Sequence, residues 1–230
     1  MTYRELVYMC LDEIKLASDD SYITEDHILF LISKYRAFLL RQKYEKTNMP
    51  APMSNYQFLE SVELKNPIPT PMSIAKPEVV ANFTLEWPDG DKTKPSTANR
   101  QTTYVPHHRF EFVGHNSVLK TIIYCALDRT NVMQFKNLPE EPELTTMPTY
   151  TLESYDIYAI FEDCLKASEF IGGEILDQEC PIEAELVSGV QELVVKDALG
   201  IAYRPKDIAN NANDDLSSLG IASGNPKNNK

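Results

Sequence analysis

The chain has 230 residues and a formal net charge of −12, from 22 Lys and Arg against 34 Asp and Glu. Its 43% hydrophobic content, with 12 Tyr and 9 Phe, is sufficient for the core of one large domain or two small ones. No apolar run approaches the roughly 20 residues of a membrane span, and the opening residues MTYRE lack the apolar stretch of a signal peptide, so we expect a soluble protein that is intracellular when synthesised and has no membrane partner.

The first predicted helix begins at Thr2. Thr2 and Glu5 have the spacing of a capping box, in which each side chain satisfies a backbone amide that the helix start leaves open. Apolar residues then recur at helical spacing, at Leu6, Met9, Cys10 and Ile14. The polar stretch ASDDSY ends this pattern.

A second helix is predicted from Thr24, with two acidic residues at its positive end. One broad apolar stripe runs along it, formed by Ile28, Leu31, Ile32, Tyr35, Phe38 and Leu39. Phe30 and Leu40 lie outside this stripe, and a helix that is apolar on most sides is buried on most sides. Two helices cannot supply that cover alone, so we expect either the rest of the chain or another subunit to supply it.

Basic residues gather toward the end of this helix, at Lys34, Arg36, Arg41, Lys43 and Lys46. Cations are favourable at the negative end of a helix, and contact with an acidic partner is the alternative explanation. The excess of apolar and basic side chains predicts an oligomer interface at Phe30, Leu40, Arg36 and Arg41.

The middle of the chain is predicted to be β-rich. Eight of the 15 prolines lie between residues 50 and 95, which excludes a long helix there. Residues 79–87 alternate between apolar and polar side chains, as in a half-buried strand. Further strands are expected at residues 109–114, 121–127, 131–136 and 155–162, with a hairpin turn at 128–131 and exposed loops at 93–103 and 140–149.

The last predicted helix starts at Pro181 and is closed by Gly200 and Pro205. Its apolar stripe consists of Leu186, Val187, Val190, Leu193, Val194 and Ala198. The sequence thus predicts an α+β fold, in which an N-terminal helical hairpin and a C-terminal helix pack beside a β-rich middle domain, a small sandwich or barrel. The expected divisions are a hairpin (1–48), a β-rich domain with Pro-rich loops (49–165), a C-terminal helix region that packs on the hairpin (166–203), and a polar docking segment with a flexible tail (204–230).

The negative charge is concentrated in one part of the chain. Between residues 139 and 197 there are 15 acidic residues against two lysines, or −13, which leaves the rest of the chain at +1. Such a surface repels phosphate backbones and excludes sequence-specific DNA binding. It is either an ordinary solvated face or a surface over which DNA passes without binding.

No catalytic or cofactor-binding motif is present, so we expect no enzyme activity, no cofactor and no metal. His107 and His108 are adjacent on a segment predicted to be extended, and their side chains would point to opposite faces. Glu162 and Asp163 have no histidine near them in the sequence. The four cysteines form no CxxC pair and are predicted to be buried free thiols, at Cys10, Cys125, Cys164 and Cys180.

The segment after the last helix is rich in Asn and Asp. It lacks the spacing, the central Gly and the closing Glu of an EF-hand calcium loop. A polar tail without structure and a peptide that docks on a neighbouring protein remain as alternatives. The docking hypothesis assigns contacts to Arg204, Asp207, Asn210, Asn211, Asn213, Asp214 and Asp215.

Three blocks of sequence, residues 1–44, 109–136 and 181–216, resemble in the same order a structural protein of crAss-like bacteriophages of Bacteroides. The resemblance implies a ring component of the neck of a short-tailed phage, a head-tail connector that stacks under the portal and joins capsid to tail. It implies about twelve copies in a homo-oligomeric ring, contact with the portal protein and other neck or tail rings, and double-stranded DNA only as non-specific passing cargo during genome ejection. Such a protein is synthesised in the host bacterial cytoplasm, resides in the virion, and carries neither catalytic residues nor a cofactor.

Two other functions stay open on the sequence alone. The first is a soluble acidic protein–protein adaptor outside the virion, which would be a monomer or dimer. The second is a hydrolase, which would need a pocket that joins Glu162 or Asp163 to a histidine.

Overall fold

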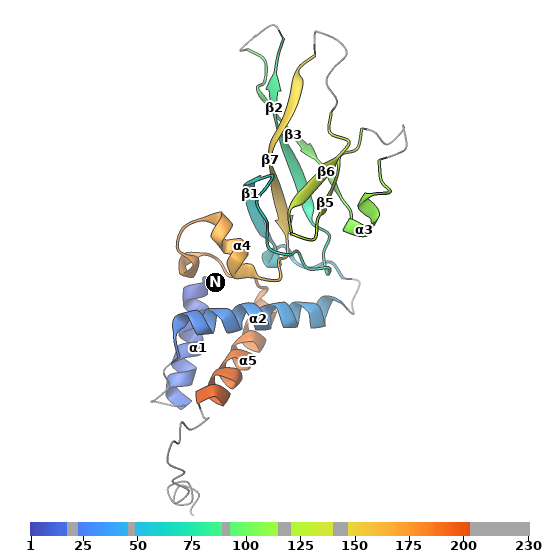
Figure 1. The fold of residues 1–230 in the computed structure, drawn as a ribbon. Coiled ribbons are helices and arrows are strands. Elements are labelled where there is room, and N and C mark those ends of the chain that lie inside the picture. Colours follow the sequence, from blue (N-terminus) through green and yellow to red (C-terminus); the bar gives the residue numbers. More distant parts are fainter. Residues whose placement is uncertain (18–22, 46–48, 89–92, 115–120, 140–146, 203–230) are drawn as a thin grey trace, which may run out of the picture.

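The structure, a computed structural model, describes residues 1–17, 23–45, 49–88, 93–114, 121–139 and 147–202. Helices from both ends of the chain gather at one end of an elongated molecule, and strands from its middle form the other end (Figure 1). This arrangement confirms the predicted α+β fold, with N-terminal helices and a C-terminal helix beside a β-rich middle.

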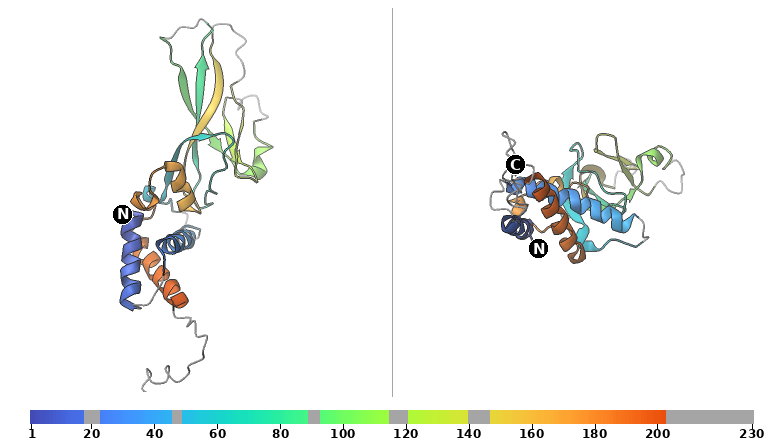
Figure 2. Two further views of the ribbon diagram at one scale, coloured as in Figure 1. Left: turned by 60° about the vertical axis from the view of Figure 1, so that its left-hand side comes forward. Right: turned by 90° about the horizontal axis from the view of Figure 1, so that it is seen from below.

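Three long helices and one short helix form the helical end. They are α1 (Tyr3–Ala17), α2 (Glu25–Tyr44), α4 (Cys164–Ile171) and α5 (Ala184–Ala202). Seen from that end, α5 crosses α2, and α1 lies beside both (Figure 2, right). Their apolar faces share one core, whose fully buried members include Leu6, Ile14, Ile32 and Val194.

The predicted starts of the first two helices are confirmed. The amide of Glu5 donates to Thr2 Oγ1 at 3.2 Å, and the amide of Thr2 donates to Glu5 Oε2 at 2.9 Å, which completes the capping box. Thr24 caps α2 by accepting from the amide of His27. The last helix differs from the prediction, because it starts at Ala184 and includes Gly200.

The strands form two sheets. The larger is antiparallel, in the order β1-β7-β2-β3, with bounds β1 Gln57–Glu63, β7 Thr149–Ala159, β2 Glu78–Glu86 and β3 Thr97–Gln101. The smaller has the order β4-β5-β6, with bounds β4 Thr103–Tyr104, β5 Tyr124–Leu127 and β6 Met133–Lys136, and β4 is parallel to β5. One buried cluster joins both sheets, since Val79 and Tyr155 of the larger sheet pack with Cys125 and Met133 of the smaller.

Several strand predictions hold, but one predicted strand and one predicted loop are wrong. Residues 109–114, predicted as a strand, begin with the short helix α3 (His107–Phe110), because Pro106 starts a helical turn that buries Phe110 and leaves Phe112 78% exposed. Residues 93–103, predicted as a loop, contain β3. This strand lies at the edge of its sheet with most of its side chains exposed, so it shows no apolar alternation. The expected turn at 128–131 is confirmed, with Asp128 accepting from the amides of Thr130 and Val132.

The sequence did not predict β1 or α4, and both lie where the two ends of the molecule meet. Gln57, the first residue of β1, donates from Nε2 to the carbonyl of Cys164 at 3.0 Å. Asp163 caps α4 by accepting from the amides of Leu165 and Lys166. These bonds fix α4 between the helices and the larger sheet (Figure 2, left).

Candidate interaction site

The oligomer interface predicted on α2 is wrong at two of its four residues. Arg36 and Leu40 are both fully buried within this chain, so a neighbouring copy cannot reach them. Phe30 is 59% exposed and remains available to a partner. Arg41 is at the surface, where its guanidinium forms an ion pair with Glu162.

Arg36 is the centre of the contact between helices and sheets. Its Nε donates to the carbonyl of Pro181 at 2.6 Å, its Nη1 to that of Phe161 at 2.9 Å, and its Nη2 to that of Asn55 at 2.9 Å. These carbonyls belong to the segments before α5, after β7 and before β1. Since a buried guanidinium is costly without partners, this one holds three chain segments against α2.

A second polar contact lies beside it. The carboxylate of Glu183 accepts from the hydroxyl of Tyr44 at 2.8 Å and from Nζ of Lys43 at 2.9 Å, and its amide donates to Asn55 Oδ1 at 2.8 Å. Burial, followed by the bond to Glu183, raises the pKa of Tyr44 above its ordinary value. The hydrogen bonds to Glu183 and Glu185 raise the pKa of Lys43.

The basic end of α2 is thus satisfied largely within the chain. Lys34 pairs with Asp197 of α5 at 3.0 Å, and the hydroxyl of Tyr35 donates to the same carboxylate at 2.8 Å. These bonds, first from Tyr35 and then from Lys34, lower the pKa of Asp197. Lys34, Arg41 and Lys43 of this helix pair with carboxylates of the same chain, an arrangement that differs from the predicted contact with an acidic partner.

The same pairs involve much of the negative charge of residues 139–197, for which an ordinary solvated face and a surface that DNA passes were the two explanations. The acidic residues of the described part of 139–197 that bond to side chains or amides of this chain are Asp156, Glu162, Asp163, Glu174, Asp177, Glu183, Glu185, Glu192 and Asp197. Most of this acidic stretch therefore neutralises cations or caps backbone amides rather than forming one free anionic face.

Large apolar side chains remain exposed on the helices. Phe30 and Phe38 lie on α2, eight residues or about 12 Å apart along the axis, and are 59% and 55% exposed. Phe38 was predicted to belong to the buried apolar stripe of this helix, and its exposure shows that this prediction is wrong. On α1, Leu16 is 88% exposed and Tyr8 45%. Apolar side chains of this kind on several faces are typical of a surface that contacts other proteins.

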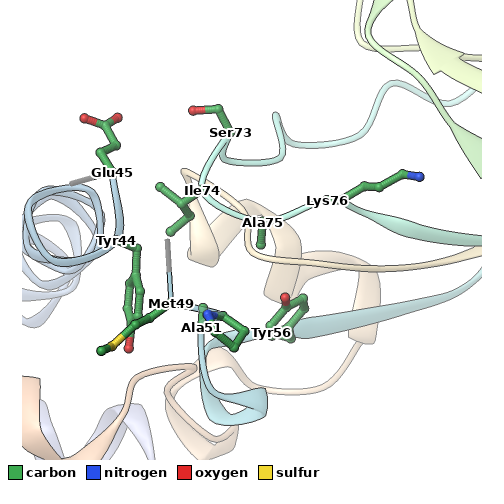
Figure 3. A pocket seen from close by; sticks show the side chains of 10 residues that line it. Tyr44, Glu45, Met49, Ala51, Tyr56, Ser73, Ile74, Ala75 and Lys76 are labelled. Atoms are coloured by element: carbon green, nitrogen blue, oxygen red, sulfur yellow. The ribbon is translucent and has the colours of Figure 1, made fainter. Parts of the chain in front are cut away.

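Two neighbouring hollows share Ser73, Ala75 and Lys76, and the first of them lies where α2 ends. The first, of about 780 Å³, is lined by Tyr44 of α2, by residues 49–51 and by residues 73–76. Figure 3 shows Tyr44, Met49, Ala51 and Ile74 around this hollow, with the amine of Lys76 directed away from it. Met49 is 70% exposed, so an apolar side chain already stands at the opening.

The second hollow, of about 590 Å³, is lined by residues of the segment 71–77, by β4 and the residues that follow it, and by Arg109 of α3. Its apolar lining comes from Pro71, Met72, Pro77, Tyr104, Val105 and Pro106. Lys76 and Arg109 line it as well. The sequence analysis did not identify this site. The sequence feature that corresponds to this hollow is a run of prolines at residues 67–77, with apolar residues between them.

The hollow that contains Glu162 and Asp163 does not have the features of a hydrolase. Its lining includes Lys166 and Glu169 but no histidine, and Glu162 and Asp163 already serve in the ion pair with Arg41 and the cap of α4. Among the described residues, no group of three His, Cys, Asp or Glu side chains could hold a metal ion. None of the helices described here combines the length and apolarity needed to cross a membrane.

The four cysteines are buried free thiols, as predicted. Burial raises the pKa of the thiols of Cys10, Cys125 and Cys180 to about 12. At neutral pH these side chains are protonated and serve as small apolar groups.

The residues predicted to dock on a partner, from Arg204 to Asp215, lie outside the described residues. The hypothesis of a docking segment therefore stays a prediction at this point. The first seven residues of the expected loop at 140–149 also lie outside the described residues, so the loop stays a prediction there.

The chain is similar to known phage ring proteins. The family model described as phage tail ring protein 2 matches residues 5–216. A protein named Ring protein 2, of Bacteroides phage crAss001, is 39% identical over 241 residues, which cover 94% of this chain and 98% of that protein.

Proposed function

The chain belongs to the phage tail ring protein 2 family, and from this premise we propose that it is a structural protein of the virion that assembles with copies of itself into a closed ring between the portal and the tail. The observation that carries the proposal is the match over nearly the whole of both chains to a curated ring protein. In this proposal the neck ring contains about twelve copies, the number that a ring stacked on a portal needs.

The helical end of the molecule supplies the surfaces for such a ring. A closed ring needs a head-to-tail contact, in which two different faces of the same chain meet around the axis. The exposed aromatic side chains of α2, Phe30 and Phe38, provide one apolar face. The rigid junction around Arg36 fixes the angle between helices and sheets, so that each copy presents its faces in the same orientation.

The portal protein and other neck or tail rings are the partners in this proposal, and DNA passes through the ring without specific contacts. The chain performs no chemistry of its own. The neutralisation of most described acidic residues within the chain argues for a weakly charged channel wall rather than a strongly repelling one.

The test is negative-stain imaging of the purified protein, alone and with the portal protein of the same phage. A ring of uniform diameter, alone or on the portal, is the expected result. A protein that stays a monomer or dimer in both samples would favour the soluble acidic adaptor outside the virion.

A further inference from the structure

The hollow of about 590 Å³ between β4 and residues 71–77 combines an apolar floor with a positive rim. Met72 and Pro77 are buried in its floor, and Tyr104 is half-buried in its wall. Lys76 and Arg109 are both exposed at the rim, and no Asp or Glu lines the hollow. The neighbouring hollow of Figure 3, in contrast, contains Glu45. We call the positively rimmed hollow the β4 groove.

The two rim cations stand apart from those of the helical end. There, Arg4, Lys34, Arg41 and Lys43 are each paired with a carboxylate. Within the described part of the chain, neither Lys76 nor Arg109 forms an ion pair. In a chain of net charge −12, two such cations beside an apolar floor favour a ligand that is both acidic and apolar.

One segment of this chain has that chemistry. Residues 207–216, with the sequence DIANNANDDL, contain three Asp and no basic residue, and end in Asp214, Asp215 and Leu216. Two carboxylates next to one apolar side chain match two cations next to one apolar floor. The family match also extends to residue 216 and so includes this segment.

The position of α5 favours a neighbouring copy as the donor. The helix ends at Ala202 on the side of the helical end that faces away from the sheets, whereas α3, whose residue Arg109 lines the groove, lies beside the sheets (Figures 1 and 2). Twelve residues connect Ala202 to Asp214, and a chain of that length spans up to about 40 Å when extended. The segment therefore leaves its own chain away from the groove with enough length to reach another molecule.

We propose that the β4 groove of one copy binds Asp214, Asp215 and Leu216 of the adjacent copy, with the carboxylates at Lys76 and Arg109 and Leu216 on the apolar floor. This inference rests on the proposed ring, in which each copy offers its groove to one neighbour and its C-terminal segment to the other. The contact is head-to-tail and closes with the ring.

Disulfide trapping in the full-length chain tests the contact. Ser73 is exposed and lines the groove, and Ser217 follows Leu216 directly, so Ser73→Cys and Ser217→Cys place nearly isosteric thiols at the two sides of the contact. The native cysteines are buried and do not compete under mild oxidation. An equal mixture of the two single variants is expected to form a linked pair roughly tenfold more than a control mixture, because docking raises the effective concentration of the thiols.

The control mixture replaces Ser73→Cys with Ser96→Cys, an exposed position beside β3. Equal yields in the two mixtures would overturn the inference. A chain that carries both Ser73→Cys and Ser217→Cys should give linked oligomers, and a linked monomer alone would overturn docking on a neighbour. Imaging of the unmodified protein tests the ring independently of the cross-link. If rings form but the two variants do not cross-link, the proposed contact is wrong and the ring proposal stands. If the variants cross-link but no rings form, the ring proposal is wrong and the contact stands.

Charge reversal provides the second readout. Lys76→Glu with Arg109→Glu in the Ser73→Cys chain should lower the yield of linked pairs by roughly five- to tenfold, because each exposed ion pair contributes up to about fivefold in affinity. Asp214→Lys with Asp215→Lys in the Ser217→Cys chain should then restore it. A yield that does not respond to either reversal would contradict the assigned charge pairing.

Discussion

Arg36 and Asn55 join the helical end of the molecule to the sheets: the Arg36 guanidinium donates to the Asn55 carbonyl at 2.9 Å. The side chain of Asn55 accepts in turn from the amide of Glu183 at 2.8 Å. The turn before β1 is thereby held on one side by α2 and on the other by the segment that leads into α5. The contact between Asn55 and Glu183 connects residues 128 positions apart in the sequence, so it forms only when both ends of the chain have folded together.

Arg36→Met should destabilise the chain more than any surface change on α2. It removes the donors of three buried carbonyls, and we expect the free energy of unfolding to fall by roughly 3–5 kcal/mol, because each buried carbonyl left without a donor costs about 1–3 kcal/mol. Arg41→Met is the matched control, since its side chain is 48% exposed and an exposed ion pair contributes at most about 1 kcal/mol. Urea unfolding measures both, and equal losses would contradict the central role of Arg36.

Stability should decrease in alkali. The folded chain holds the thiols of Cys10 and Cys125 at a pKa of about 12, well above their ordinary value of about 8.5. Because the pKa of each thiol is higher in the folded than in the unfolded chain, the free energy of unfolding is unchanged below about pH 8.5. It decreases as the pH rises toward 12, since the unfolded chain then loses thiol protons that the folded chain retains. At pH 10 each such thiol should contribute a loss of about 2 kcal/mol. Cys10→Ala should make this decline shallower, and a free energy of unfolding that is constant from pH 8.5 to 10 would refute the assignment.

The exposed aromatic residues of α2 should matter for assembly and not for folding. Phe30→Ala with Phe38→Ala should change the melting temperature by less than a few degrees, because both side chains are more than half exposed, and should reduce ring formation on the portal. Phe112→Ala is the matched control, since Phe112 is 78% exposed beyond α3. Thermal melts and negative-stain counts of rings measure the two effects. If the control reduces ring formation as much as the double variant, α2 is not the contacting face.

Removal of the C-terminal segment should separate folding from assembly. A chain that ends after Tyr203 retains every residue of the cores described above, so its melting temperature should change little. Its incorporation into rings should fall, because the proposed ion pairs with Lys76 and Arg109, each worth up to about 1 kcal/mol, are lost with residues 204–216. If the truncated chain is incorporated normally, the segment is a polar tail that binds no partner. If the truncated chain fails to fold, the segment contributes to the packing of the core.

The sequence predicted what depends on local patterns. Thr2 with Glu5, the strand at 79–87 and the turn at Asp128 follow from spacing, alternation and side-chain caps, and each is confirmed. The edge strand β3 was missed because strands exposed on both faces need no alternation. Phe110 and Phe112 are two residues apart, which is the spacing of apolar side chains on one face of a strand, and this spacing led to the wrong prediction. Pro106 instead begins a helical turn there.

The residues of the candidate site were harder to predict from the sequence. Arg36 looked like one more cation at the end of a helix, and only the folded chain brings the carbonyls of Asn55, Phe161 and Pro181 around it. Leu40 lay outside the apolar stripe of α2, yet it is buried against Met72 from a loop that packs on the other side of the helix. Long-range packing decides both positions, and no local pattern encodes it.

The most direct test of the ring proposal is a cryo-electron-microscopy reconstruction of the neck and tail of virions that carry this chain. We predict about twelve copies around the tail axis, each with the helical end and the sheets in the arrangement of Figure 1, in one closed ring between portal and tail. Copies scattered over the outside of the capsid, or purified virions without the chain, would contradict it.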